Sequence, residues 1–146
     1  MADKTLQPLT DERCWELLAS RDVGRLAVSV ANRPDVFPVN YRVDGETILI
    51  RTAAGNKLAA ATLGKGVAFE VDALNESVET GWSVVVQGQA DVIERLDEWM
   101  HAEDLDIHTW VPGEKHRYIR IRPERVEGRR IADYTGSFAG PSCLTS

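Results

Sequence analysis

Residues 36–51 read VFPVNYRVDGETILIR, and this stretch decides the fold. Two runs of β-forming residues, Val36–Val43 and Thr47–Arg51, flank Asp44-Gly45, a dipeptide typical of a tight hairpin turn. Pro38 has no backbone N–H to donate to a neighbouring strand. The first strand is therefore expected to lie at a sheet edge or to carry an irregularity at Pro38.

Further strands and short helices are expected on both sides of this hairpin. Thr10 is a candidate N-cap, and Cys14, Leu17, Leu18 and Arg21 follow at helical spacing, which predicts a short amphipathic helix ended by Gly24. Strands are expected at Arg25–Val30, Val67–Val71, Trp82–Ile93, His116–Ile121 and Val126–Ile131, a turn at Asn32–Asp35, and helices at Lys57–Leu63 and Leu96–Ala102. Six or seven strands joined mostly by tight turns predict a mainly β protein, a closed or partly closed antiparallel barrel with a few short helices.

The chain of 146 residues is interpreted as one domain, with residues 1–9 as a polar leader and residues 133–146 as a less ordered tail. Its net charge of −6 and pI of about 5.1 argue against partners such as nucleic acid or an anionic membrane. No segment resembles a bilayer span or a signal peptide. Cys14 and Cys143 form no disulfide framework, so a cytoplasmic protein with a buried Cys14 is expected.

The segment from Ile50 to Leu58 carries the clearest chemical signal. A strand ends in Arg51-Thr52, a glycine-containing loop follows, and Lys57 stands at the start of a helix. Two cations, a hydroxyl and the free N–H groups of a helix N-terminus suit a phosphate monoester. The alternative is an ordinary strand–loop–helix junction whose two cations face solvent.

Two other segments suggest contacts with a planar ring. Asn40 is a polar residue among apolar neighbours in the strand that contains Pro38, and its amide could recognise the polar edge of a heterocycle. Trp82-Ser83 begins a strand with an aromatic and a hydroxyl that could flank such a ring. The simpler interpretations are a solvent-facing Asn40 and a core tryptophan.

Other chemistries have weaker support. The histidines His101, His108 and His116 share no metal-ligand spacing, so no metal site is expected. Ser83 has no evident histidine partner for a hydrolase triad. The acidic stretch Glu103–Asp106 is interpreted as a solvated face, and no G-x-G-x-x-G sequence follows a strand.

Taken in order, these segments resemble the FMN-binding split-barrel superfamily related to pyridoxamine 5'-phosphate oxidase, in particular its small actinobacterial and nitroimidazole-resistance-like members. The resemblance runs from about Leu9 to Ile131. Its carriers are Val23–Ala27, Pro38–Tyr41, Arg51-Thr52 with Lys57-Leu58, Phe69–Asp72, Gly81–Gly88 and Gly128–Ile131.

The resemblance implies a homodimer that holds FMN, or the deazaflavin F420, at its interface. It implies that the phosphate is held by Arg51, Thr52 and Lys57, with Asn56 in the same loop. Val39 and Asn40 would lie against the ring with Pro38 and Ala53 nearby. Trp82, Ser83 and Val84 would approach the ring from the second subunit.

Two departures from the superfamily pattern qualify this expectation. Many relatives carry an arginine immediately before the phosphate-binding lysine, where this chain has Asn56. The loss of one charge-assisted hydrogen bond is worth about 1–2 kcal/mol of phosphate binding, or it indicates a different cofactor. True pyridoxamine phosphate oxidases also have an Arg-x-His segment after the last strand, and here Ala132-Asp133-Tyr134 follows Ile131. Oxidation of pyridoxamine phosphate is therefore not expected.

The function expected from the resemblance is a flavin- or deazaflavin-dependent oxidoreductase acting on a small organic substrate. In such proteins the cofactor supplies the chemistry and the protein places the ring. One alternative is a non-catalytic flavin- or haem-binding protein on the same fold, with His101, His108 or His116 as an axial ligand. Another is an interaction domain with a vestigial pocket.

Overall fold

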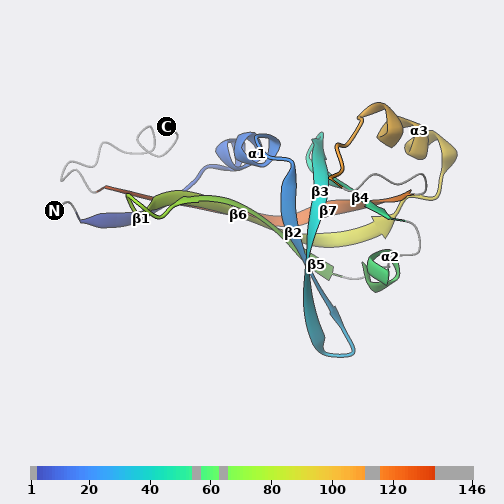
Figure 1. The fold of residues 1–146 in the computed structure, drawn as a ribbon, viewed down its shortest axis with the longest axis horizontal. Coiled ribbons are helices and arrows are strands. Elements are labelled where there is room, and N and C mark those ends of the chain that lie inside the picture. Colours follow the sequence, from blue (N-terminus) through green and yellow to red (C-terminus); the bar gives the residue numbers. More distant parts are fainter. Residues whose placement is uncertain (1–2, 54–56, 63–65, 111–115, 134–146) are drawn as a thin grey trace.

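A computed structural model describes residues 3–53, 57–62, 66–110 and 116–133 of the chain. In chain order its elements are β1 (Lys4–Pro8), α1 (Asp11–Ala19), β2 (Val23–Val30), β3 (Arg33–Asp44), β4 (Thr47–Ala53), α2 (Lys57–Thr62), β5 (Gly66–Asn75), β6 (Thr80–Val92), α3 (Leu96–Asp104) and β7 (His116–Asp133) (Figure 1). The predicted mainly β class is confirmed.

All the strands in this part of the chain belong to one antiparallel sheet that closes on itself. The strand order is β1-β7-β4-β3-β2-β5-β6, and β6 also pairs with β7. The strands from β2 to β7 therefore form a ring, and β1 is added beside the end of β7. This is the closed antiparallel barrel that the sequence predicted.

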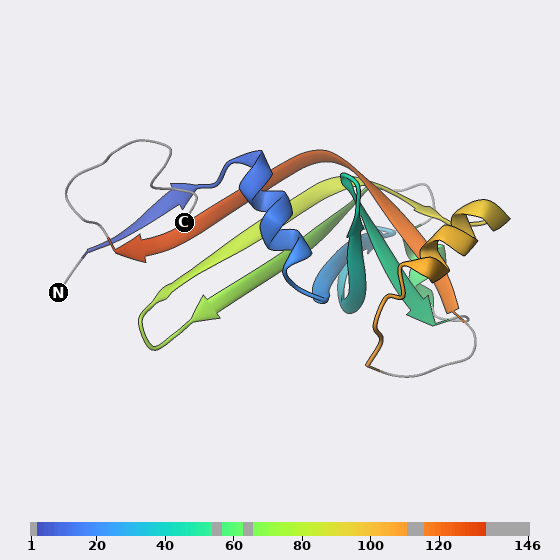
Figure 2. The same ribbon diagram turned by 90° about the horizontal axis from the view of Figure 1, so that it is seen from above.

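The strand β7 pairs with three other strands. Its first residues, His116–Ile121, pair with β4, its last residues, Arg129–Asp133, pair with β1, and β6 accompanies most of its length. Figure 2 shows β7 curving along the molecule with β1 beside its end. The prediction of two separate strands was wrong because Pro123 lies opposite Gly88, at a register shift where Glu124 of β7 is skipped and a missing N–H is tolerated.

The predicted leader, residues 1–9, was also wrong in part. Lys4–Pro8 form β1, and the Lys4 ammonium donates a hydrogen bond of 2.5 Å to the Asp133 carboxylate. Asp133, the first residue of the predicted tail, is instead the last residue of β7. The rest of that tail, residues 134–146 with Cys143, lies outside the described residues.

Helix α1 begins as predicted and ends earlier than predicted. The Thr10 hydroxyl accepts a hydrogen bond of 3.2 Å from the Arg13 N–H, which is the expected N-cap. The helix ends at Ala19, and Gly24 lies in β2. A Cβ at Gly24 would come within 2.4 Å of the Phe69 ring, so this glycine allows a close ring contact rather than ending the helix.

The barrel interior is apolar and is closed on one side by α1. Cys14 is fully buried, as predicted, together with Leu18 of the same helix. The principal interior side chains from the strands are Leu26, Ile48, Ile50, Phe69, Val84, Val86, Ile119 and Ile121.

None of the helices in the described residues is long and apolar enough to cross a membrane.

The hairpin of β3 and β4 is as the sequence predicted, and it leaves part of β3 at an edge. Asp44 pairs with Thr47, and Gly45 takes a φ of 62° in the turn between them. Within β3, only Asn40–Asp44 pair with β4, so the first half of β3, with Pro38, has only β2 beside it among the described strands. The edge predicted at Pro38 is confirmed.

The β2–β3 hairpin, which projects from the barrel in Figure 1, turns one step earlier than predicted. Its turn is made by Ala31 and Asn32, whose φ angles are 51° and 61°. The predicted turn at Asn32–Asp35 was wrong because Arg33, Pro34 and Asp35 already pair with β2.

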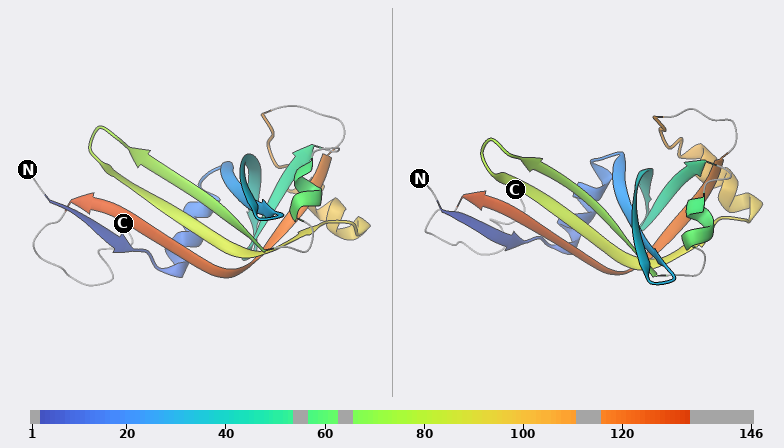
Figure 3. Two further views of the ribbon diagram at one scale, coloured as in Figure 1. Left: turned by 90° about the horizontal axis from the view of Figure 1, so that it is seen from below. Right: turned by 60° about the horizontal axis from the view of Figure 1, so that its bottom comes forward.

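Helix α3 covers the outer face of β4 and β7. Ala102 of this helix and Ile107 after it pack with Leu49 and Tyr118 in a second apolar cluster. Figure 3 shows α2 and α3 at the same end of the molecule, near the end of β4. The predicted helices at Lys57–Leu63 and Leu96–Ala102 are thus present, α3 being slightly longer, and Leu63 lies outside the described residues.

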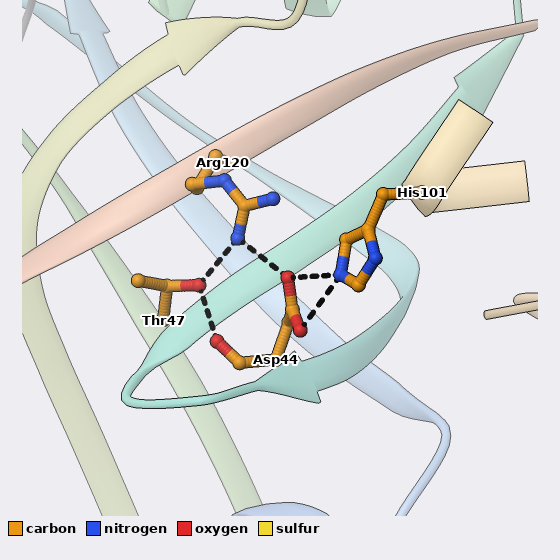
Figure 4. Close-up of polar contacts among 4 residues, drawn as sticks. All are labelled: Asp44, Thr47, His101 and Arg120. Carbon is orange, nitrogen blue, oxygen red and sulfur yellow. Dashed lines mark hydrogen bonds and ion pairs between the residues drawn. The ribbon is translucent and has the colours of Figure 1, made fainter. Parts of the chain in front are cut away.

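A polar network fastens α3 to the β3–β4 turn (Figure 4). The Asp44 carboxylate accepts hydrogen bonds from His101 of α3 at 3.0 Å and from Arg120 of β7 at 2.9 Å. Arg120 also donates to the Thr47 hydroxyl at 2.7 Å. Burial alone would raise the pKa of Asp44, but the hydrogen bonds and charges of His101 and Arg120 outweigh it and hold the pKa below the ordinary value.

Replacing Gly88 with alanine is expected to disrupt the pairing of β6 with β7 that closes the barrel. A Cβ at Gly88 would lie 2.0 Å from the Arg122 carbonyl oxygen, so the backbone of β7 must shift. Gly88→Ala should lower the free energy of unfolding by about 1–3 kcal/mol in urea titrations. Gly66→Ala is the matched control, because Gly66 is on the neighbouring strand and its Cβ would meet no atom nearer than 3.8 Å. Equal stability of the two variants would contradict the interpretation.

Replacing Asp44 with asparagine is expected to loosen α3 in a pH-dependent way. Because the folded-state pKa of Asp44 is lowered, its stabilisation is present above its ordinary pKa of 3.8 and is lost as the pH falls through the folded value. Asp44→Asn should cost about 1–3 kcal/mol at pH 7, and this difference should shrink below about pH 4. Asp97→Asn, at an exposed pair with Arg95, is the control and should change stability little. A difference that does not vary with pH would refute the network's ionic character.

Candidate functional site

Arg51 and Asn40 lie side by side on the outer face of the barrel. They are directly paired across β3 and β4, and on its other side Arg51 is paired with Tyr118 of β7. Successive residues of a strand point to opposite faces. Because Ile50 belongs to the barrel core and Leu49 to the cluster under α3, Arg51 shares the α3 side of the sheet.

The Arg51 guanidinium is half-buried and contacts a backbone carbonyl and a histidine ring. Its Nη1 donates to the Ile107 carbonyl oxygen at 3.3 Å, and its Nη2 contacts His116 Nδ1 at 3.3 Å. Among the described residues, no carboxylate forms an ion pair with it. Arg25 and Arg120, by contrast, are each paired with carboxylates. The positive charge of Arg51 therefore remains available to an anion.

Charged residues lie near Asn40 on the outer face, beyond Pro38. Pro38 is opposite Arg25 of β2, and Arg25 is opposite Glu70 of β5. The Arg25 guanidinium lies 3.3 Å from the Glu70 carboxylate and 3.5 Å from that of Asp72. Burial and the neighbouring Asp72 raise the pKa of Glu70 to about 7, more than Arg25 lowers it.

Three of the predicted site residues have side chains that are almost fully buried in the barrel. Val39, Thr52 and Val84 are 6%, 7% and 0% exposed. The Thr52 hydroxyl thus lies on the opposite face of β4 from Arg51. Contacts of Val39 and Val84 with a ligand on the outer face would have to come from their backbone atoms.

The end of β4 and the start of α2 are only partly described. Ala53 is exposed and lies opposite His116. Lys57 is the first residue of α2, and its side chain lies outside the described part. Asn56 also lies outside the described residues.

Trp82 and Ser83 lie at the other end of the barrel from Arg51. Trp82 pairs with Arg130 and Ser83 with Arg129, near the end of β7, whereas Arg51 pairs near its beginning. Within one chain the structure does not bring these two groups together. The Trp82 ring has the Arg21 guanidinium 6.0 Å from its centroid.

Trp82 also lines a cavity of about 280 Å³ between α1 and the ends of β6 and β7. Leu17 of α1 and Ile131 of β7 contribute apolar walls, and Arg13 and Arg130 add positive charge. The charge of Arg13 is offset by its ion pair with Glu16, at 2.8 Å.

The environment of Arg51 was not predicted from the sequence. The sequence suggests His116 only as a metal or haem ligand, but its ring contacts Arg51 and Glu103 and stacks on Trp99 with a centroid distance of 5.1 Å. The alternation of His116 and Tyr118 in a strand was the available signal that both rings face one side. No sequence pattern indicated that this side carries Arg51.

Comparison with known proteins places the chain in a family. A family model described as pyridoxamine 5'-phosphate oxidase matches residues 10–130. An uncharacterized protein of Mycobacterium tuberculosis is 35% identical over 128 residues, which is 84% of either chain.

Two solved structures share both the fold and part of the sequence. An FAD binding protein from Mycobacterium smegmatis is 35% identical with a TM-score of 0.77, over 85% of this chain and 97% of that one. An FAD-binding protein from Mesorhizobium loti is 28% identical with a TM-score of 0.72, over 86% and 97% of the two chains. The family match, these identities and the closed antiparallel barrel agree, and this chain belongs to the pyridoxamine 5'-phosphate oxidase family of split-barrel proteins.

Proposed function

We propose that this protein is an oxidoreductase that binds a flavin nucleotide, FMN in the first instance, through its phosphate, and acts on a small organic substrate. The observation that carries the proposal is the half-buried Arg51 guanidinium without a carboxylate partner in the described part of the chain, paired across the strands with Asn40.

The residues around Arg51 fit a phosphate group. A guanidinium has five N–H donors, and the contacts with Ile107 and His116 leave several of them free to bind phosphate oxygens. Lys57, at the start of α2 shortly after β4, is the second cation expected there. Asn56 supplies no charge, so Arg51 carries a larger share of the phosphate interaction.

The outer face beside Arg51 fits the flavin ring. Asn40 is half-buried there, and its amide can donate to or accept from the polar edge of a flavin. Pro38, two residues away on the same face of β3, is exposed and offers a flat apolar contact. When bound, the flavin supplies reversible electron or hydride transfer, while these residues bind and orient it.

The comparisons support a flavin and leave several nucleotide forms to be tested. The two related structures come from FAD-binding proteins, and FMN, FAD and F420 all carry a phosphate that riboflavin lacks. Separate titrations distinguish them, and binding of riboflavin measures the ring contribution alone.

We also propose that the protein is a homodimer with a shared site. The β1 and β5–β6 end of the molecule exposes apolar side chains: Leu6 is 57%, Leu74 63% and Val78 53% exposed. Such a patch suits an interface with a second copy. Trp82 and Ser83 of one subunit would then contact the flavin ring bound near Arg51 of the other subunit. This arrangement would bring together residues that lie far apart within one chain.

Removal of the Arg51 charge tests the phosphate site. Arg51→Ala should raise the dissociation constant for FMN about 10- to 100-fold and leave that for riboflavin nearly unchanged, because only FMN has the phosphate. Fluorescence titration measures both constants. Arg33→Ala, an exposed arginine next to the β2–β3 turn, is the control and should bind FMN as the wild type does. Unchanged FMN affinity in Arg51→Ala would refute the site.

Mixing two defective variants tests the shared site. Arg51→Ala and Trp82→Ala homodimers should each bind FMN weakly. After the two are unfolded together and refolded, mixed dimers place an intact Arg51 and an intact Trp82 at one site, so about a quarter of all sites should regain tight binding. A mixture that binds no better than its components would contradict the shared arrangement, and a monomeric mass in light scattering would exclude it.

A further inference from the structure

His116 contacts Arg51 on the side opposite to the carboxylate of Glu103. It begins β7, opposite Ala53 at the end of β4, with a side chain that is 14% exposed. Its Nδ1 lies 3.3 Å from Arg51 Nη2, and its Nε2 contacts the Glu103 carboxylate of α3. The imidazole therefore lies between an arginine and a carboxylate that would otherwise be free to attract each other.

This arrangement selects one tautomer of the ring. A guanidinium only donates hydrogen bonds, so Nδ1 must accept and carries no hydrogen. A carboxylate accepts, so Nε2 carries the hydrogen and donates it to Glu103. The ring thus offers Arg51 a neutral acceptor that is polarised by the carboxylate behind it.

The ring itself is held by aromatic neighbours. Trp99 of α3 stacks on His116 with an interplanar angle of 14°, and Tyr118 contacts the edges of both rings at centroid distances of 5.2 Å and 4.9 Å. Tyr118 is buried, and its burial together with the charge of Glu103 raises its pKa to about 12, so it stays neutral. The orientation of His116 is therefore set by packing from both α3 and β7.

We propose that His116 is a positioning residue that aims the Arg51 guanidinium at the ligand phosphate and keeps it from pairing with Glu103, so that His116 determines the preference for phosphorylated over unphosphorylated flavins. This inference rests on the proposed function. Its physical basis is that Arg51 pre-oriented by neutral acceptors retains its full charge for the phosphate and loses less conformational freedom on binding.

Two substitutions separate the contacts of the ring. In His116→Gln the longer amide reaches the Nε2 position and keeps a donor toward Glu103, but it places no acceptor at the Nδ1 position that faces Arg51. In His116→Asn the side-chain oxygen occupies the Nδ1 position and keeps the acceptor for Arg51, but it loses the contact with Glu103. The two variants are matched in chemistry and differ in which partner they retain.

The measurement is the ratio of the dissociation constants for riboflavin and FMN. His116→Gln should reduce this ratio about tenfold, as expected for one hydrogen bond to a charged group, and His116→Asn should restore most of it. Added to Arg51→Ala, His116→Gln should cause no further loss, because His116 acts through Arg51. Damage to the fold would instead weaken the binding of both flavins equally.

The tautomer gives a second measurement that needs no variant. In ¹⁵N–¹H correlation spectra of the wild-type protein, the His116 ring should show a bare Nδ1 and a protonated Nε2. The Nδ1 signal should shift on addition of FMN and not of riboflavin. A protonated Nδ1 would overturn the inference.

The remaining outcomes distinguish the inference from the proposed function. If the wild type binds FMN and riboflavin equally, the phosphate site fails and the inference fails with it. If the wild type prefers FMN and His116→Gln keeps that preference, the phosphate site stands and the role of His116 is refuted.

Discussion

The pairing of β6 with β7 is the interaction on which the rest of this structure depends. It joins the two ends of the sheet, and it is possible because Gly88 lets the two backbones approach at the register shift opposite Pro123. With the ring closed, the interior is filled by side chains that alternate with outward-facing ones. Because the sheet is closed, each strand has one inward and one outward face, and Arg51 lies on the outward face.

Closure also explains why the candidate site lies outside the barrel. The barrel core is packed with apolar side chains, which leaves no room for a planar ring among them, and Arg51 lies on the outer face. Helix α3 covers part of that face and brings Ile107 and Glu103 to Arg51 and His116. The network at Asp44 fastens the same helix to the β3–β4 turn. The contacts that hold Arg51 and His116 therefore depend on the position of α3, which is fixed by the separate hydrogen bonds of Asp44.

Much of the fold could be predicted because its signals are local. The turn at Gly45 sets the hairpin register, and that register places Asn40 opposite Arg51. Strand β1 escaped prediction because its short polar sequence becomes a strand only by pairing with the far end of β7. The continuity of β7 was hidden by Pro123, whose missing donor is tolerated next to an irregularity of β7 itself, where Glu124 has no pairing partner in β6.

The candidate site could be predicted to a smaller extent, since its parts meet through tertiary packing. The Arg51 segment and Asn40 were identified from residue type and spacing. The contacts of Arg51 with Ile107 and His116 join residues far apart in sequence, through a helix whose docking no local pattern describes. The inward orientation of Thr52 follows from strand alternation once Ile50 is assigned to the core.

The first half of β3, which has only β2 beside it in the described structure, is protected against pairing with another chain. The ladder with β2 is continuous from Arg33, so Pro34 and Pro38 fit only where their nitrogens face the open edge. The N–H of Val36, between them, donates to the carboxylate of Asp35 at 3.1 Å. An incoming strand thus finds no free donor along this edge. The hairpin can project into solvent with little tendency toward edge-to-edge aggregation.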